Sequence, residues 1–568
     1  MGFDITFDLE THSAAERWDR RSDFIRLCAY AFNDNDPELV TPETMSRVIE
    51  LADVSIGHNI LSYDIPVLAL DLGLDMHSLV RDHRLVDTKL TAFLNDPPSE
   101  RMKTGQVEKA YSLQSLTGAK AGDLKQLAKQ WGGFGSIPIN DPEFVAYLKG
   151  DVRAARKLYG TLTLSPYVWR EHRVAAIAAQ ISMNGFLVDQ ALLERRLAEG
   201  ANTKSEGIRK LTDVYGLPTT KKDGKPVTSP QATEAGKHAI DMAFRALKVT
   251  LPRTQAGAPA LGQDVMDEVV ERYGENPEVL MLADLVKSLN GVRTVYQTVA
   301  DNLHYGRVHP DIAMRQVSGR WSVSKPGLTV MGKRGGRYHE REIFLPEADE
   351  VIISVDLDQV DARAIAAHSQ DHAYMDLFSP GRDLHTEVAV AVWNDPSRRE
   401  DAKVIGHGWN YGMSPRGMVR SFGIPIHVAE QFDLRMTEQF PRLVEWRTEV
   451  RERAENSDFL NNGFGRKMRV NRDRAWTQGP ALMGQGTARD ILMEGLLRLP
   501  SELLPMLRAV VHDEVVLSVP RHDAHDIYKT VIDSLSFPWT PPHGSRPIYI
   551  TAGLAGPPSP SWGGVYEK

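Results

Sequence analysis

The sequence predicts a multidomain protein that combines α/β and α+β domains. Its 568 residues are too many for one hydrophobic core and suggest three or four domains. Strand-like alternation in residues 3–10 and apolar β-branched runs at 350–356 and 510–519 lie between long stretches of helical periodicity. The apolar fraction of 42% and charged fraction of 25% are typical of a globular protein.

Composition excludes several classes of protein. No apolar run approaches the roughly 18 residues of a membrane span, so we expect no membrane partner. The single cysteine, Cys28, excludes an intramolecular disulfide framework and a cysteine-based zinc cluster, and it suits a reducing compartment such as the cytoplasm. The start MGFDIT fits a loose myristoylation pattern, but Gly2 directly precedes a predicted buried strand. We therefore expect neither acylation nor a signal peptide.

The net charge of −8 argues weakly against a nucleic-acid partner, because the distribution of charge matters more than its sum. Residues 314–342 hold seven Lys and Arg against two Glu, a local charge of +5. Two interpretations stay open at this point. Such a stretch can line a cleft for a polyanion, or it can be solvated surface.

The elements follow one another in a consistent order. Residues 1–165 mix short strands with helices, as in an α/β domain, and residues 168–215 have long helical periodicity. Helices joined by polar loops containing Pro and Gly are expected up to about residue 308. Residues 398–460 are expected to be mostly helical, and the last strand pattern is PIYITAGLAG, residues 547–556.

Carboxylates recur in the N-terminal region. In FDITFDLET the period of two places Asp8 and Glu10 on one face of a strand. Asp64 follows in GHNILSYDIPVL, and Tyr147 and Asp151 are spaced i, i+4 on one face of a predicted helix. Neighbouring carboxylates repel each other, and a divalent cation relieves that repulsion.

This set suits hydrolysis of a phosphodiester. Two Mg²⁺ ions about 4 Å apart clamp the attacking and leaving oxygens and need hard oxygen ligands. A tyrosyl hydroxyl such as that of Tyr147 can orient the attacking water. Each motif alone is weak, but their order within 151 residues resembles the proofreading 3′–5′ exonucleases of the D-E-D-D type with a tyrosine in the third motif. A fold of this type that has lost its activity is the alternative.

A second carboxylate pair is predicted further along the chain. In VVHDEVVLSV, residues 510–519, two apolar runs flank His512, Asp513 and Glu514. A purely structural interpretation is a hairpin turn whose backbone is capped by the side chain of Asp513. Asp356 follows the apolar run Val351–Val355, and if the two strands are neighbours in one sheet, Asp356 and Asp513 can converge on two metal ions for attack on a nucleotide phosphate.

A cationic stripe accompanies this pair. In SRREDAKVIGHGWNYGM, Arg399, Lys403, His407 and Tyr411 are spaced four residues apart along one face of a helix. The cations can hold phosphates near one end of the stripe, and Tyr411 can stack on a base near the other.

These motifs, in this order, resemble those of the family A DNA polymerases, and most of all the phage replicative enzymes that have an exonuclease but no 5′-nuclease domain. DLDQVDAR and VHDE look like the two palm motifs, and REDAKVIGHGWNYG looks like the fingers helix. EHRVAAIAAQISMNGFLVD resembles the start of a thumb. Further segments match intervening signatures of the family: SGRWSVSKPGL, RDLHTEVAV, NNGFGRKMRV and LMGQGTARDIL.

The resemblance implies a role for each motif. Asp356, Asp513 and the backbone carbonyl of Leu357 are expected to bind catalytic Mg²⁺. Two ions are expected at each of the two sites, with Mn²⁺ able to substitute. The incoming nucleotide is expected to contact a set of residues comprising Arg399, Lys403, His385, His407, Tyr411, Gln359 and Asp361. The residues expected to face the primer–template are Arg320, Gln485 and His512.

The resemblance also implies the architecture and the partners. An RNase H-like exonuclease domain (1–165) is expected to precede a right-hand polymerase made of thumb (166–308), palm (309–390 and 476–568) and fingers (391–475). The partners are primer–template DNA and dNTPs, in the cytoplasm of a bacterial host infected by a phage. The thumb region looks too short for a processivity insertion, so we expect a monomer without a thioredoxin-type subunit.

Two positions depart from the family pattern. The family carries Glu where this chain has Asp361, which puts exclusion of the ribose 2′-hydroxyl in doubt. It carries Phe or Tyr where this chain has His407, whose imidazole ring is smaller. Neutral drift is one explanation, and an altered nucleotide pocket, for instance for a modified base, is the other.

Two other functions stay open. One is a 3′–5′ exonuclease on a degenerate polymerase scaffold, against which the four residues Asp356, Asp513, Arg399 and Lys403 argue. The other is a non-catalytic factor that binds primer–template, against which the two complete carboxylate sets argue.

Overall fold

The computed structural model describes residues 2–567 except residues 20–22, 100, 101, 103, 120–123, 221–223, 228, 255, 256, 291, 333–336 and 380. The chain divides into two compact units. The first unit comprises Met1–Gly185, His309–Ser324 and Pro346–Pro560, and the second comprises Phe186–Val308, Lys325–Leu345 and Ser561–Lys568. The boundaries predicted for thumb, palm and fingers stay predictions. No described helix has the length and apolarity that crossing a bilayer requires.

The N-terminal part of the first unit is built on a five-stranded sheet with the order β3-β2-β1-β4-β5. Strand β1 runs antiparallel to β2 and parallel to β4. The alternation predicted for residues 3–10 is confirmed, because Ile5, Phe7 and Leu9 are buried on one face of β1. The strands are β1 (Asp4–Thr11), β2 (Ile25–Phe32), β3 (Glu38–Val40), β4 (Val54–Gly57) and β5 (Leu85–Asp87).

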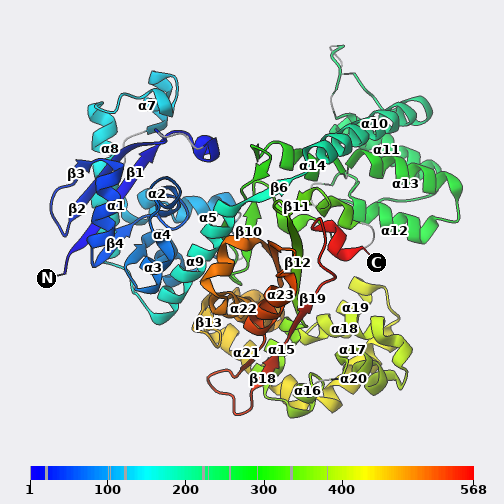
Figure 1. Ribbon diagram of the computed structural model, residues 1–568. Coiled ribbons are helices and arrows are strands. Elements are labelled where there is room, and N and C mark those ends of the chain that lie inside the picture. The colour runs from blue at the N-terminus through cyan, green and yellow to red at the C-terminus, as the bar shows by residue number, and fades with distance from the viewer. Residues whose placement is uncertain are drawn as a thin grey trace. The chain divides into compact units, whose positions relative to one another are not determined.

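Helices cover this sheet. Helix α8 (Pro142–Tyr159) packs on β1 and β2, as Figure 1 shows, and Asp141 caps its N-terminus by accepting from the backbone N–H of Phe144. The other helices of this part are α1 (Pro42–Leu51), α2 (Asp64–Leu72), α3 (Met76–Arg81), α4 (Thr88–Asn95), α5 (Thr104–Ala110), α6 (Leu113–Thr117) and α7 (Leu124–Trp131).

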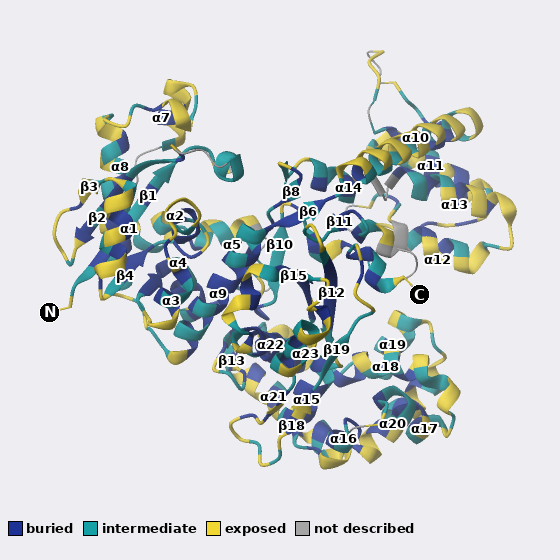
Figure 2. Cartoon of the chain, in the orientation of Figure 1, coloured by how far each residue is buried: buried dark blue, intermediate teal, exposed yellow. Residues whose placement is uncertain are grey.

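The second sheet of this unit has the order β15-β16-β12-β19, with every neighbour antiparallel. Helices α15 and α22 pack together, α23 packs on β12, and α9 packs on β15. Figure 2 shows that strands β12 and β15 are buried, which agrees with their near-continuous apolar sequences. The elements are β12 (Glu350–Leu357), β15 (Leu507–Val511), β16 (Glu514–Pro520), β19 (Ala552–Leu554), α9 (Pro166–Asn184), α15 (Val360–Ser369), α22 (Ala475–Arg498) and α23 (Ala524–Leu535).

A helical segment lies between α15 and α22 in the chain, as the sequence predicts. It is followed by a short hairpin, β13–β14, and its helices begin at capping residues such as Asp383 and Ser414. Its elements are α16 (His372–Asp376), α17 (Leu384–Trp393), α18 (Arg399–Asn410), α19 (Pro415–Phe422), α20 (Ile426–Gln439), α21 (Pro441–Asn456), β13 (Phe459–Asn461) and β14 (Lys467–Arg469). The unit also contains the β9–β10 hairpin (Asp311–Met314 and Trp321–Ser324) and the β17–β18 pair (Phe537–Trp539 and Ile548–Ile550).

The second unit is mainly helical, as predicted, and contains one small sheet with the order β11-β6-β8-β7. Its helices enclose an apolar cluster that includes Phe244, Leu282 and Val286. Its elements are α10 (Gln190–Tyr215), α11 (Glu234–Ala246), α12 (Gln263–Tyr273), α13 (Pro277–Asn290), α14 (Val292–Ala300), β6 (Phe186–Val188), β7 (Leu303–His304), β8 (Arg307–Val308) and β11 (Phe344–Leu345).

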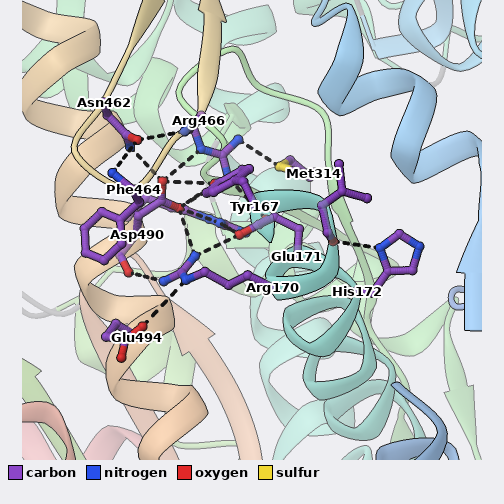
Figure 3. A network of polar contacts seen from close by, with 12 residues as sticks. Tyr167, Arg170, Glu171, His172, Met314, Asn462, Phe464, Arg466, Asp490 and Glu494 are labelled. Atoms are coloured by element: carbon purple, nitrogen blue, oxygen red, sulfur yellow. Dashed lines mark hydrogen bonds and ion pairs between the residues drawn. The ribbon is translucent and has the colours of Figure 1, made fainter. Parts of the chain in front are cut away.

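A buried ionic network joins helix α9 to α22 and to Arg466, the residue just before β14, within the first unit (Figure 3). Glu171 accepts from Arg489 at 2.6 Å and from Arg466 at 3.2 Å. Asp490 accepts from Arg489 at 2.7 Å, and the hydroxyl of Tyr167 donates to it at 2.9 Å. Because each buried charge has an opposite partner, this network fixes α9 against α22 and the β13–β14 hairpin.

Candidate functional site

The structure brings the predicted N-terminal carboxylates together. Asp8 and Glu10 lie on β1 and Asp151 on α8, and one ligand oxygen from each lies within 4.8 Å of the others. Asp64 begins α2, is buried, and accepts from the backbone N–H of Leu9 at 3.2 Å. The parallel pairing of β1 with β4 brings α2, which follows β4, close to these residues.

Electrostatics disfavour simultaneous ionisation of these carboxylates. Burial and the neighbouring carboxylates raise the pKa of Glu10 to about 8, and burial raises the pKa of Asp64 to about 7 and of Asp151 to about 6. Burial, reinforced by the other three carboxylates, raises the pKa of Asp8 well above its usual value. Converging hard oxygen donors that repel one another fit a divalent cation.

Tyr147 lies beside this cluster, as its spacing predicts. Its hydroxyl donates a hydrogen bond to Asp151, one helical turn away on α8. Burial and the charge of Asp151 raise the pKa of Tyr147, so the phenol stays protonated at neutral pH and keeps a proton to donate.

Two supporting residues were not predicted from the sequence. Buried Asp87, at the end of β5, accepts from the backbone N–H groups of Asn59 and Leu61 at 3.1 and 3.0 Å, and so fixes the loop that precedes Asp64. The backbone N–H of Asp87 donates to Nε2 of His172 on α9 at 2.8 Å. Asp87 looks like an ordinary helix cap in the sequence, so only the fold reveals this support.

The second predicted carboxylate pair lies on adjacent strands. The hairpin prediction is confirmed: β15 and β16 pair through Val511 and Glu514, which leaves His512 and Asp513 as the turn, with His512 at φ 60°. Asp356 on β12 pairs with Glu514, and the backbone N–H of Leu357 donates to the carbonyl of Asp513 at 3.1 Å. Asp356 and Asp513 therefore lie at the same end of the two central strands, β12 and β16.

Glu514 is buried and differs from its two neighbours in the turn. One of its carboxylate oxygens accepts from the hydroxyl of Ser354 at 2.7 Å, and the side chain is fully shielded from solvent. His512 is exposed and Asp513 is half-buried. This difference follows from their places in the hairpin: Glu514 begins β16, between β15 and β12, whereas His512 and Asp513 form the turn.

The cationic stripe lies on α18 as predicted, with Arg399 and Lys403 half-buried and His407 exposed. Arg399 donates two hydrogen bonds to Asp383, a residue that was not predicted from the sequence. His385 lies on α17, where burial lowers its pKa. The positive charges of Arg399 and Lys403 also lower this pKa, and the negative charge of Asp383 opposes them. Asp383 is 16 residues from Arg399 in the chain and is recognisable in the sequence only as a helix cap.

Tyr411 at the end of α18 meets two of the other predicted residues. Burial and the charge of Asp361, in the first turn of α15, raise the pKa of Tyr411, and its ring packs edge-on against His407 with 5.1 Å between the ring centroids. Arg320 donates through Nη2 to both carboxylate oxygens of Asp361, at 3.2 and 3.1 Å. The two departures from the family pattern therefore both act on Tyr411, Asp361 through its charge and His407 through a ring contact.

The remaining predicted residues lie near these groups. Gln359 caps the start of α15 in a left-handed conformation, φ 52°. Gln485 is half-buried on α22, next to Gly484, where an added Cβ would lie 2.9 Å from the ring of Tyr411.

The basic stretch 314–342 is not uniform surface. Arg315 pairs with Glu108 at 2.6 Å, whereas Arg341 is buried and donates to the carbonyl of Met331. Residues 333–336 of the stretch lie outside the described residues.

Comparisons with known proteins agree with this arrangement. Residues 236–538 match the family model for DNA polymerase family A. The chain is 25% identical over 530 residues to the DNA polymerase of Mycobacterium phage D29, covering 86% of this chain and 82% of that protein. It is 30% identical over 483 residues to the thermostable DNA polymerase I of Thermus filiformis, covering 74% of this chain and 55% of that protein.

A solved structure has a similar fold. The POL domain of Pol1 from M. smegmatis, in complex with DNA primer-template and dNTP, superposes with a TM-score of 0.70 and 16% identity. The match covers 99% of this chain and 96% of that chain. At this identity the likeness shows the fold alone.

Proposed function

The chain belongs to DNA polymerase family A. We propose that it copies a DNA template at the end of strands β12 and β16 that carries Asp356 and Asp513, and that it removes mispaired primer ends at the Asp8–Glu10–Asp151 cluster. As a family member it is a DNA polymerase, an enzyme that uses divalent metal ions. The observation that carries the assignment of the first site is the placement of Asp356 and Asp513 on paired strands, joined by the Leu357–Asp513 hydrogen bond.

In the proposed synthesis step the primer 3′-oxygen attacks the α-phosphorus of the dNTP, its proton goes to solvent, and the bond to the β-phosphate breaks to release pyrophosphate. Two Mg²⁺ ions, held by Asp356, Asp513 and the Leu357 carbonyl, would neutralise charge on the attacking and leaving oxygens. Arg399, Lys403 and His385 bind the triphosphate. Catalysis rests mainly on positioning and charge stabilisation.

The residues around Tyr411 complete the nucleotide pocket. Tyr411 packs at the nascent base pair, and His407, Gln359 and Asp361 surround the incoming nucleotide. Arg320, Gln485 and His512 face the primer–template near the primer end. The proximity of Arg320, Asp361 and Tyr411 supports this placement, because Arg320 donates to the Asp361 carboxylate and the charge of Asp361 raises the pKa of Tyr411.

In the proposed proofreading step a water molecule attacks the terminal phosphodiester, which releases a nucleoside monophosphate and restores a primer 3′-hydroxyl. Asp8, Glu10, Asp64 and Asp151 would hold two Mg²⁺, with Mn²⁺ able to substitute. Tyr147 orients the water. The convergence of four carboxylates with raised pKa values supports this assignment, because a divalent cation would favour their ionised forms together.

We assign exonuclease, thumb, palm and fingers to the residue ranges predicted above. The enzyme is proposed to replicate phage DNA as a monomer in the bacterial cytoplasm, without a thioredoxin-type subunit. Template-dependent extension of a labelled primer, with Mg²⁺ and dNTPs supplied, tests the polymerase assignment. Products that follow the template sequence are expected, and shortening alone would support the exonuclease-only alternative.

A further inference from the structure

Trp476 is an exposed aromatic residue at the beginning of α22. Its side chain is 56% exposed, although a tryptophan has a large apolar surface to bury. Its indole N–H donates to the carbonyl of Gly412 at 3.2 Å, and the guanidinium of Arg451 lies 3.7 Å from the ring centroid. Arg451 occupies one face of the ring, so the exposed surface is mainly the other face and the edge.

The exposed Trp476 lies close to Tyr411, a residue of the proposed nucleotide pocket. Gly412, which Trp476 contacts, directly follows Tyr411, and the ring of Tyr411 packs at Gly484 two turns further along α22. Tyr411 and Gly412 therefore lie alongside α22, with Gly412 at Trp476 and the ring of Tyr411 at Gly484. Trp476 and Gln485 are nine residues apart, which corresponds to about 13 Å along a helix.

In the proposed function, the order Gln485, Tyr411, Trp476 along α22 follows the template from its paired part toward its unpaired part. In the proposed function Gln485 faces the paired primer–template and Tyr411 lies at the nascent pair. Trp476 lies beyond Tyr411 on the side away from Gln485. The template strand on that side is still unpaired.

We propose that Trp476 is a stacking platform for one of the first unpaired template bases ahead of the nascent pair, an inference that rests on the proposed polymerase function. Single-stranded nucleic acids bind where an exposed aromatic ring lies next to cations, since bases stack on the ring and phosphates pair with the charges. Arg451, which also pairs with Glu455, supplies a cation at the ring. The turn η7 (Arg472–Arg474), just before α22, adds Arg474 and adds Arg472, which pairs with Asp458.

The alternative role for Trp476 is purely structural, as a link between α22 and the end of α18. The two roles differ in their dependence on DNA. A structural link affects binding of every DNA equally, whereas a stacking platform affects only DNA that has an unpaired template base at the right position.

The experiment measures dissociation constants by fluorescence anisotropy in a chelating buffer, so that primers are not shortened. The proteins are wild type, Trp476→Ala, Trp476→Phe and the control Trp131→Ala, which removes another exposed tryptophan, at the end of α7. The DNAs are a blunt duplex, the same duplex with an unpaired template extension, and that extension with an abasic site at each of its first positions in turn.

We expect Trp476→Ala to weaken binding of the extended duplex by about 5- to 150-fold and to leave the blunt duplex unaffected, because one stacked base contributes that much. Trp476→Phe should retain most of the affinity, and Trp131→Ala should bind as wild type does. One abasic position should weaken wild type by a similar factor and have no further effect on Trp476→Ala, which identifies the contacted base.

Equal losses on blunt and extended DNA, or abasic effects that are the same in wild type and Trp476→Ala, would overturn the inference. A parallel primer-extension assay separates this outcome from failure of the proposed function. If wild type extends primers but shows no coupling between Trp476 and an abasic site, only the stacking role is wrong. If wild type does not extend primers, the proposed function itself is wrong.

Discussion

Arg399 forms a bidentate ion pair with Asp383: its Nε donates to Oδ2 at 2.9 Å and its Nη2 to Oδ1 at 3.0 Å. Asp383 also caps α17 by accepting from the backbone N–H of Thr386 at 2.8 Å. Burial opposes ionisation of Asp383, but the hydrogen bonds from Arg399 and Thr386 outweigh it and lower the pKa to about 2. The carboxylate is therefore charged at neutral pH and fixes the orientation of the arginine that we assign to the triphosphate.

Replacing Asp383 by Asn is expected to raise the KM for dNTPs about tenfold, equivalent to about 1.4 kcal/mol, with a smaller effect on kcat. Asn still caps a helix, so the melting temperature should change little. The charge-assisted pair with Arg399 is weakened, and the arginine loses its fixed orientation. Steady-state incorporation of a single nucleotide measures both constants.

The matched control is Asp395→Asn, which alters another capping aspartate, one that accepts from Ser397 at the start of a 3₁₀ turn. It should leave the KM unchanged. A KM for Asp383→Asn that equals or falls below that of wild type would show that Asp383 competes with the triphosphate for Arg399 and does not position it.

Asp361→Glu is expected to strengthen discrimination against ribonucleotides. Arg320 donates to the Asp361 carboxylate, and the charge of that carboxylate acts on Tyr411. The added methylene of Glu would carry the carboxylate further toward the sugar of an incoming nucleotide. The ratio of kcat/KM for dNTP over rNTP should rise about tenfold or more. An unchanged ratio would mean that Asp361 does not face the ribose.

Incorporation of base-modified dNTPs by wild type would test separately whether the pocket at His407 accepts an altered base.

Glu171→Gln is expected to destabilise the first unit by about 3–5 kcal/mol, because it leaves Arg466 and Arg489 with one fewer buried carboxylate. The side chains of all three residues are at most 2% exposed. As a control, Glu449→Gln breaks the exposed pair with Arg442 and should change stability by less than about 1 kcal/mol. Urea denaturation followed by tryptophan fluorescence compares the midpoints. Similar midpoints for the two variants would contradict the role given to the network.

The same network predicts a dependence on pH. Burial opposes ionisation of Asp490 and Glu171, but the arginines outweigh it and lower both pKa values below their ordinary ranges. Groups with lowered pKa values stabilise the fold above the unfolded values of about 4, and this contribution is lost as the pH falls below them. The stability difference between wild type and Glu171→Gln should therefore be constant from pH 7 to about 5 and shrink below about pH 4. A difference that grows as the pH falls would be inconsistent with this sign.

The sequence predicts those parts of the two sites that depend on local periodicity. A period of two placed Asp8 and Glu10 on one face of β1, and the pattern around His512 and Asp513 predicted their hairpin turn. The structure confirms that these residues meet their expected neighbours, while their chemical roles stay predictions.

The supporting residues could not be predicted in the same way. Glu171 and Arg466 are 295 positions apart, and Asp87 and His172 are 85 positions apart, so no local pattern connects them. Asp383 is recognisable only as a helix cap. Contacts that depend on how separate elements pack together need the fold.

The most direct test of the two-site account is a primer assay with wild type, Asp513→Ala and Asp8→Ala, each with Mg²⁺ and with or without dNTPs. Asp513→Ala should lose extension but still shorten primers without dNTPs, and Asp8→Ala should extend primers but no longer shorten them. Each variant then removes one activity and leaves the other. If Asp513→Ala still extends primers, or if Asp8→Ala still shortens them at the rate of wild type, the assignment of that site is wrong.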